Sequence, residues 1–233
     1  MNYLAHLHLA PDDAAARVGN LLGDFLKPSH AGHLPPALQQ GMALHRQIDR
    51  YTDSHPLVAH SKQRIATARR RYAGILVDIF YDHFLARHWT EFAAMPLADF
   101  TSRSYAELDA HRPWLPPRLL EILPRMQAED WLQSYAEIDG IAAVLRGFSR
   151  HRIRRDNPVA DGIDDLSQHY CALEQDFLGF YPQLQQVVAT GRMAAAREAS
   201  AMQQVGVALD QLGEQLLHPF PHDLHPQTHQ DEG

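Results

Sequence analysis

The stretch GILVDIFYDHFLARHW, residues 74–89, decides the fold that this chain is expected to adopt. Wound as a helix at about 100° per residue, it is apolar on nearly every side, and such a helix is usually buried. Asp78 and Asp82 lie four residues apart in it, so both carboxylates project from one stripe. Because an ionised carboxylate in a dry interior is costly unless a cation or good donors meet it, a metal ion or a cationic side chain must lie beside this helix.

The rest of the chain also has helical periodicity, and strand-like alternation is essentially absent. We therefore predict an all-α fold, a bundle of roughly seven to nine helices. Prolines and capping residues mark the boundaries between the helices. The expected helices cover residues 14–26, 37–55, 57–72, 74–89, 97–110, 118–127, 131–150 and 164–190.

Length and composition indicate a globular protein with an appendage. The 233 residues suffice for one domain with a sizeable core, and 45% hydrophobic with 21% charged residues excludes wholesale disorder. Residues 1–190 are predicted to form the main domain. Residues 191–233 are predicted to form an extension that is helical at first and disordered in its Pro- and His-rich end, residues 218–233.

Charge, cysteine content and hydropathy limit the surroundings of the protein. The net charge of −7 argues against general nucleic-acid binding. The single cysteine, Cys171, excludes an internal disulfide framework and a cysteine-based zinc site, and we expect it to be a packed thiol. The sequence has no basic leader and no apolar run of about 20 residues, so we expect no signal peptide and no membrane association, and we predict a cytoplasmic protein.

Acidic residues and histidines recur one helical turn apart in the first 90 residues. Three separate helical segments carry such a pair, and ligands that converge on one cation explain this better than three unrelated buried networks. Oxygen and imidazole ligands without thiolate suit Mn²⁺, Fe²⁺ or Mg²⁺ as well as zinc. The pairs are Asn20 with Asp24, His45 with Asp49, and Asp78 with Asp82 beside His83.

Each of these signals is weak when it is taken alone. A His and an Asp one turn apart, such as His45 and Asp49, more often form a solvent-facing hydrogen-bonded pair than a metal site. His6 and His8 would point the same way on an extended segment, but on a helix they are about 200° apart and cannot bind one ion.

A helical bundle with inward-facing metal ligands has two main uses, the hydrolysis of phosphate esters and oxygen chemistry. Oxygen chemistry typically relies on Glu-x-x-His repeats, which are absent from this region. Metal-assisted hydrolysis of a phosphate ester is therefore the leading hypothesis.

Four motifs, in this order along the chain, resemble one protein family. They are NYLAHLHLA at residues 2–10, GNLLGDF at 19–25, LHRQID at 44–49 and DIFYDHFLARHW at 78–89. Together they look like the acyl carrier protein phosphodiesterase family, which is related to the HD-domain metallohydrolases. The resemblance covers roughly the first 190 residues and implies an HD-like multi-helix bundle.

The resemblance implies a reaction, a partner and a cofactor. Water would cleave the phosphodiester bond between 4′-phosphopantetheine and a serine of holo acyl carrier protein, giving 4′-phosphopantetheine and the apo carrier protein. Mn²⁺ is the expected activator, with Mg²⁺ or Fe²⁺ as alternatives. The residues that match the family motifs imply a ligand set of Asp24, His45, Asp78 and Asp82, followed by His6 and Asp49.

The reaction also needs groups that stabilise charge and move protons. Asp24 is expected to be essential to catalysis as well as to metal binding. Arg46 or Arg150 would stabilise the charge that develops on the phosphate. His83 or His8 would give a proton to the leaving serine oxygen.

An acidic carrier protein needs a local basic surface on this net-negative chain. Two arginine-rich segments are candidates for that surface. A run such as residues 69–71 is most often a solvated helix C-terminus, whereas residues 146–155 are explained equally well as a solvated turn and as a docking surface. Their docking residues are Arg69, Arg70, Arg71, Arg150, Arg152, Arg154 and Arg155.

Two rival hypotheses remain at the level of the sequence. One is an HD-type phosphohydrolase that acts on a nucleotide, with the same metal site and a different substrate pocket. The other is a non-enzymatic helical scaffold in which the acids pair with arginines in buried networks, and it predicts no stoichiometric metal ion.

Overall fold

The structure, a computed structural model, describes residues 1–151, 153 and 156–216, with side chains as far as residue 191. These residues form eleven α-helices, three short 3₁₀ helices and no strand, which confirms the all-α prediction. The helix count exceeds the predicted seven to nine because three of the helices have only four to seven residues. The elements are α1 (Tyr3–Leu9), α2 (Ala14–Leu22), η1 (Pro28–His30), α3 (Pro36–Ser54), α4 (Pro56–Arg64), η2 (Thr67–Tyr72), α5 (Ala73–Arg87), α6 (Trp89–Phe92), α7 (Leu97–Ala110), η3 (Arg112–Trp114), α8 (Pro117–Ala128), α9 (Trp131–Ser134), α10 (Ile138–His151) and α11 (Gly162–Leu216).

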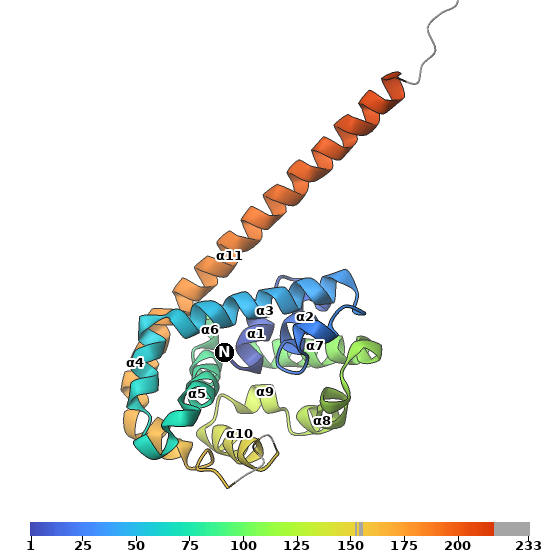
Figure 1. Cartoon of the computed structure of the whole chain (residues 1–233). Coiled ribbons are helices and arrows are strands. Elements are labelled where there is room, and N and C mark those ends of the chain that lie inside the picture. Colours follow the sequence, from blue (N-terminus) through green and yellow to red (C-terminus); the bar gives the residue numbers. More distant parts are fainter. Residues whose placement is uncertain (152, 154–155, 217–233) are drawn as a thin grey trace, which may run out of the picture. The chain divides into compact units, whose positions relative to one another are not determined.

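Helix α5 forms where the sequence predicts it and lies in the core. Eleven of its fifteen residues are buried, including Leu76, Val77 and Phe80 without any exposed surface. Helices α1, α4 and α10 pack against it (Figure 1). Its apolar circumference is thus covered on several sides, which confirms that this stretch is a buried helix.

Helices α1, α2 and α3 form a layer beside α5. Helix α3 lies along α2, and α1 contacts both α2 and α5 (Figure 1). The close approach of α2 to α3 depends on two glycines. A Cβ atom on Gly19 would lie 2.3 Å from the carbonyl oxygen of Leu38, and one on Gly41 would lie 2.3 Å from the carbonyl oxygen of Ala16.

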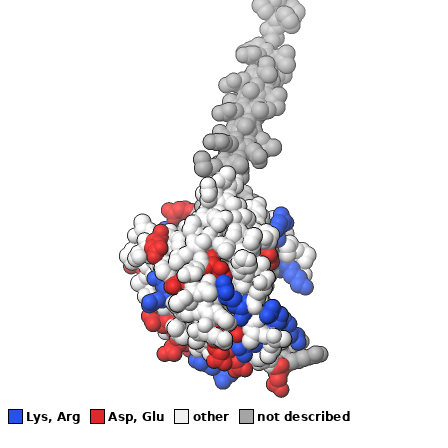
Figure 2. Space-filling model, turned by 90° about the vertical axis from the view of Figure 1, so that its left-hand side faces the viewer, with Lys and Arg blue, Asp and Glu red and all other residues white. Residues whose placement is uncertain are grey.

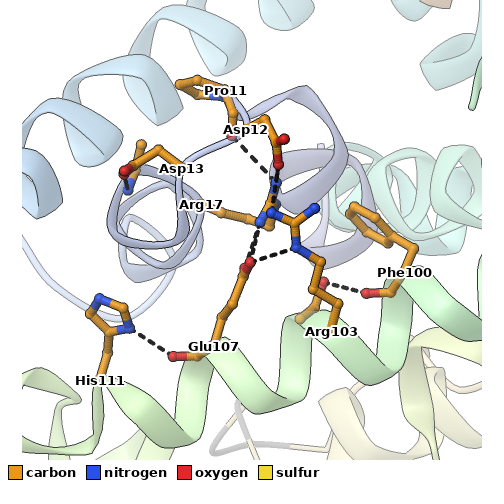
Figure 3. A network of polar contacts seen from close by, with 10 residues as sticks. Pro11, Asp12, Asp13, Arg17, Phe100, Arg103, Glu107 and His111 are labelled. Atoms are coloured by element: carbon orange, nitrogen blue, oxygen red, sulfur yellow. Dashed lines mark hydrogen bonds and ion pairs between the residues drawn. The ribbon is translucent and has the colours of Figure 1, made fainter. Parts of the chain in front are cut away.

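A network of ion pairs joins α2 to α7 (Figure 3). The guanidinium of Arg17, which is 4% exposed, donates to both carboxylate oxygens of Glu107 at 2.5 and 2.6 Å. Arg103 donates to Glu107 and to Asp12, so two arginines and two carboxylates share the network. Because loss of Glu107 would deprive the buried guanidinium of Arg17 of its closest carboxylate, the Arg17–Glu107 pair is the part of this network that holds α2 on α7.

Three predicted helices end earlier or break in the structure. Helix α2 ends at Leu22 and not at residue 26, and the chain continues as a turn in which Asp24 N donates to the carbonyl oxygen of Leu21 at 3.1 Å. Gly23 lies against the ring of His45, where a Cβ atom would lie 2.2 Å from Cγ. Asp24 therefore lies in the turn after α2 and not within the helix.

The predicted helix over residues 57–72 is divided into α4 and η2. The chain is extended at Ile65, and the carboxylate of Asp165 accepts hydrogen bonds from Ala66 N at 3.1 Å and from the Arg69 guanidinium at 2.6 and 2.9 Å. Asp165 thus satisfies a backbone donor that the break would otherwise leave without a partner.

The predicted helix over residues 131–150 is divided into α9 and α10. The backbone of Gly140 packs on the end of α9, where a Cβ atom would lie 1.9 Å from the carbonyl oxygen of Ser134. By contrast, α7 covers residues 97–110 as predicted, and α8 differs from its predicted bounds by one residue at each end.

The expectation of a packed thiol at Cys171 is wrong. Its side chain is exposed on α11, whose buried positions include Leu173, Phe177 and Phe180. Cys171 lies on the other face of this helix, so its helical phase and not its residue type decides its exposure.

The described chain divides into two units, residues 1–188 and residues 189–233. The second unit is helical as far as Leu216, the last residue of α11. The predicted disorder of residues 218–233 lies outside the described residues. None of the helices in the described part of the chain combines the length and the hydropathy that a membrane-spanning segment requires.

Candidate metal centre

The carboxylate of Asp82 fixes the position of α1. It accepts hydrogen bonds from the backbone N–H groups of Leu4 at 2.7 Å and Ala5 at 3.2 Å. These N–H groups belong to the first turn of the helix, where a carboxylate satisfies donors that have no intrahelical partner. Burial raises the pKa of Asp82 to about 8, although the two N–H groups act against that rise. These two bonds attach α1 to α5. Because α1 carries His6, they also determine where His6 lies.

Asn20 connects the two histidines of the centre. Its side-chain Nδ2 donates to the carbonyl oxygen of His6 at 2.7 Å, so its Oδ1 faces Nδ1 of the same histidine at 3.2 Å. Its backbone carbonyl oxygen lies 2.8 Å from Nδ1 of His45. The two imidazole rings stack with their centroids 3.9 Å apart.

These contacts determine which ring nitrogens are free to bind a ligand. Both partners of the Nδ1 atoms are oxygen acceptors, so each Nδ1 carries the hydrogen and donates it. In the neutral form of each ring, Nε2 then holds a lone pair. Burial lowers the pKa of His6 to about 4, so this ring is neutral at pH 7.

Both Nε2 atoms face the carboxylate of Asp49. The Nε2 atom of His45 lies 3.0 Å from Oδ2, and that of His6 lies 3.2 Å from Oδ1. Although burial raises it, contacts with both imidazoles and with the Met1 amine hold the pKa of the Asp49 carboxyl below its ordinary value. The centre thus brings two imidazole nitrogens and a carboxylate together, an arrangement that favours a bound cation.

The donor set fits a divalent metal ion. One ligand atom from each of His6, His45 and Asp49 lies within 4.8 Å of the others. The buried Nε2 of His6 has no hydrogen-bond partner among the described residues. Two imidazoles and one carboxylate form a ligand set that suits Mn²⁺, Fe²⁺ and Zn²⁺.

A second group of acids adjoins the centre. The Met1 amine lies 3.0 Å from Oδ1 of Asp78 and 3.5 Å from Oδ1 of Asp49. Burial lowers the pKa of this amine, but the carboxylates of Asp78 and Asp49 outweigh burial and raise it to about 10. Asp78 and Asp24 also line a cavity of about 270 Å³ together with Asn2 and Phe148, which we call the acid cavity.

The structure therefore brings together three of the six predicted ligands. His6, His45 and Asp49 share one cluster. Asp24 and Asp78 line the adjoining acid cavity, and Asp82 binds the backbone of α1.

The predicted proton donors make other contacts. His8 bonds to the hydroxyl of Tyr181 at 2.7 Å. His83 donates from Nδ1 to the carbonyl oxygen of Tyr135 at 2.8 Å, and its Nε2 lies 2.9 Å from the hydroxyl of Tyr170. Burial lowers the pKa of His83.

The predicted charge-stabilising residues, Arg46 and Arg150, are both exposed. Of the predicted docking residues, Arg69 pairs with Asp165, and Arg70 donates to the carbonyl oxygen of Ile65. The guanidinium of Arg71 lies 4.7 Å from the ring centroid of Tyr72. The side chains of Arg152, Arg154 and Arg155 lie outside the described residues.

The face of the molecule in Figure 2 carries basic side chains interspersed with acidic ones. They do not gather there into a single basic patch.

Asn20 is the residue whose role the sequence did not indicate. It was paired with Asp24 on the assumption of one continuous helix, whereas it orients His6 and His45. An amide side chain within the apolar helix AAARVGNLL was the available signal, because a buried amide needs partners.

Comparison with known proteins agrees with the resemblance seen in the motifs. The sequence model of the acyl carrier protein phosphodiesterase family matches residues 1–184. Proteins named acyl carrier protein phosphodiesterase from Salmonella agona and Salmonella newport are each 40% identical over 185 residues, which is 79% of this chain and 95% of the relative. No solved structure matches the chain. Matches of this extent and identity show that the chain belongs to the acyl carrier protein phosphodiesterase family.

Proposed function

We propose that this protein hydrolyses the phosphodiester bond between 4′-phosphopantetheine and the carrier serine of holo acyl carrier protein, with a divalent metal ion, Mn²⁺ in the first place, at the His6–His45–Asp49 cluster. One observation carries the metal-dependent part of this proposal. The Nε2 atoms of two buried imidazoles converge on one carboxylate, and both Nδ1 atoms contact oxygen atoms of Asn20.

The reaction follows from the residues around the cluster. Water adds to phosphorus, the bond from phosphorus to the serine oxygen breaks, and that oxygen takes up a proton. When it is bound, a divalent ion lowers the pKa of a water molecule and neutralises charge on the phosphate. His6, His45 and Asp49 would hold the ion, and Asn20 keeps both rings in the required tautomer.

Other residues have supporting roles in this proposal. Asp24 and Asp78 border the cluster in the acid cavity, where they complete the negative surroundings of a cation. Arg46 follows His45 and is exposed, so we propose that it pairs with the phosphate. The roles of His8 and His83 as proton donors stay predictions, because the bonds described for their rings lead to Tyr181, Tyr135 and Tyr170.

The test compares Asp49→Asn with Asp53→Asn. Asp53 lies one turn further along α3, is exposed and pairs with Lys62, so it is a matched control. The mass of holo acyl carrier protein is measured after incubation with each protein and Mn²⁺. The wild type and Asp53→Asn should remove the phosphopantetheine mass, and the rate of Asp49→Asn should fall by at least about 100-fold.

Two results would contradict the proposal. If no divalent ion supports loss of the phosphopantetheine mass by the wild type, the substrate is wrong, and small nucleotides become the next substrates to assay. If Asp49→Asn cleaves the carrier protein as fast as Asp53→Asn, the reaction takes place elsewhere on the molecule.

A further inference from the structure

A second, larger cleft lies between α8 and α10. It has a volume of about 390 Å³, within the range of about 300–1,000 Å³ that is typical of small-molecule sites. Residues of α8, α9 and α10 line it, together with Tyr3 of α1 and Phe25, which follows α2. We call it the α8–α10 cleft. Its apolar lining includes Tyr3, Ile122, Trp131, Tyr135, Val144 and Phe148.

The α8–α10 cleft and the acid cavity adjoin. Phe148 lines both of them. Tyr3 and Phe25 line the cleft, with their ring centroids 5.5 Å apart, while their chain neighbours Asn2 and Asp24 line the acid cavity. Phe148 therefore lies at the boundary that the two cavities share.

Charged side chains at the α8 side of the cleft are already paired with one another. Arg118 donates to Glu121 at 2.7 Å, and Arg125 donates to Glu129 at 2.9 Å. The guanidinium of Arg125 also lies 5.8 Å from the ring centroid of Trp131. A cleft with compensated charges and an apolar lining suits an uncharged ligand that carries a few polar groups.

We propose that the α8–α10 cleft binds the pantetheine arm of the holo carrier protein while the phosphate lies at the metal cluster. This inference rests on the proposed function, which places the phosphate beside the acid cavity. The arm attached to that phosphate is an uncharged chain of methyl, methylene and amide groups with one hydroxyl, and it ends in a thiol. Of the two adjoining cavities, the α8–α10 cleft is the larger and has the more aromatic lining, whereas Asp24 and Asp78 place two carboxylates in the other.

A larger side chain at Gly147 would fill part of the cleft and thereby test the proposal. Gly147 lies on α10 and lines the cleft, and a Cβ atom added there would meet nothing within 4 Å. Gly147→Leu should therefore fold and occupy the space of the arm. Gly32→Leu is the matched control, because Gly32 also has open space around it but does not line the cleft. Ala143→Leu, at a second position of the lining, guards against a local defect of the Gly147 variant.

Three measurements separate binding of the arm from chemistry. For holo acyl carrier protein, Gly147→Leu and Ala143→Leu should lower kcat/KM by at least about tenfold, mainly through KM. With bis(4-nitrophenyl) phosphate, a diester without the arm, both variants should match the wild type. Calorimetry should find weaker binding of 4′-phosphopantetheine to both variants and unchanged binding of inorganic phosphate, while Gly32→Leu matches the wild type throughout.

The outcomes for the arm site and for the proposed function are distinguishable. Wild-type KM and wild-type affinity for 4′-phosphopantetheine in both cleft variants would overturn the arm site and leave the function in place. Binding of 4′-phosphopantetheine that depends on Gly147, in a wild type that does not cleave the holo carrier protein, would overturn the function and support the arm site.

Discussion

Asn20 contacts both histidines of the centre, one through its side-chain amide and the other through its backbone carbonyl oxygen. Its Oδ1 and its backbone carbonyl oxygen each accept from a histidine Nδ1, so one residue sets the tautomer of two rings. A residue that orients a metal-binding histidine in this way also increases the basicity of the nitrogen that faces the metal. Because Asn20 is fully buried, water cannot replace it in this role.

Loss of the Asn20 side chain should weaken metal binding more than it weakens the fold. We expect Asn20→Ala to reduce the affinity for Mn²⁺ by about 10–100-fold, since the ring of His6 loses the partner that orients it. The free energy of unfolding should fall by about 1–3 kcal/mol, because a buried donor and acceptor are left without partners. Calorimetric titration with Mn²⁺ and urea denaturation measure the two effects.

Thr52→Val is the control for this variant. Thr52 is buried on α3, and its hydroxyl has no hydrogen-bond partner among the described residues, so the change should leave the affinity for Mn²⁺ unaltered. An unchanged Mn²⁺ affinity in Asn20→Ala would show that the rings are oriented without the amide.

At the scale of elements, the crossing of α2 and α3 decides whether the centre forms. Asn20 comes from α2, and His45 and Asp49 come from α3. The two backbones approach closely because Gly19 and Gly41 have no Cβ atom. Because the two helices lie close together, Asn20 on α2 can contact His45 on α3.

Gly41→Ala should separate the two helices. Its Cβ atom would lie 2.3 Å from the carbonyl oxygen of Ala16, which belongs to the backbone and cannot rotate away. We expect a loss of about 1–3 kcal/mol in the free energy of unfolding and weaker Mn²⁺ binding. Gly147→Ala is the matched control, because open space surrounds that helical glycine, and it should gain roughly 0.5–1 kcal/mol.

Thermal denaturation of the two glycine variants checks this prediction. Equal melting temperatures would mean that α2 and α3 can move apart without any loss in the free energy of unfolding. A lower melting temperature for Gly41→Ala with unchanged Mn²⁺ affinity would separate the packing of the helices from the geometry of the centre.

At the scale of the molecule, the first unit contains the core and the candidate centre. Residues 1–188 form this unit, and the family match ends at residue 184. The Salmonella relatives are covered over 95% of their length by 185 matched residues. We therefore propose that residues 191–233 are an extension that the reaction does not need.

Truncation tests this proposal. A chain that ends at residue 190 should keep the melting temperature within a few degrees and the rate on holo carrier protein within about twofold. A chain that ends at residue 179 is the contrasting variant, since it lacks the fully buried Phe180, Tyr181 and Leu184 and should lose about 5 kcal/mol or more. Loss of folding in the 190-residue chain would mean that the second unit stabilises the first.

Local patterns in the sequence determined the helical class, the central helix and one pair of ligands. The apolar circumference of residues 74–89 required a buried helix, and α5 is that helix. The spacing of His45 and Asp49 placed both on one face of α3, where their side chains meet at 3.0 Å. Such features depend on the helical period, which a single segment reveals by itself.

Only the tertiary structure decided how these segments meet. Asp82 binds the backbone of Leu4 across 78 residues of sequence, and His6 reaches Asp49 only because α1 is held there. The breaks at Ile65 and before Gly140 likewise depend on contacts with groups outside the local period. A helical period specifies which side chains share a face, but it contains no information about what lies opposite that face, and the packing of distant segments supplies it.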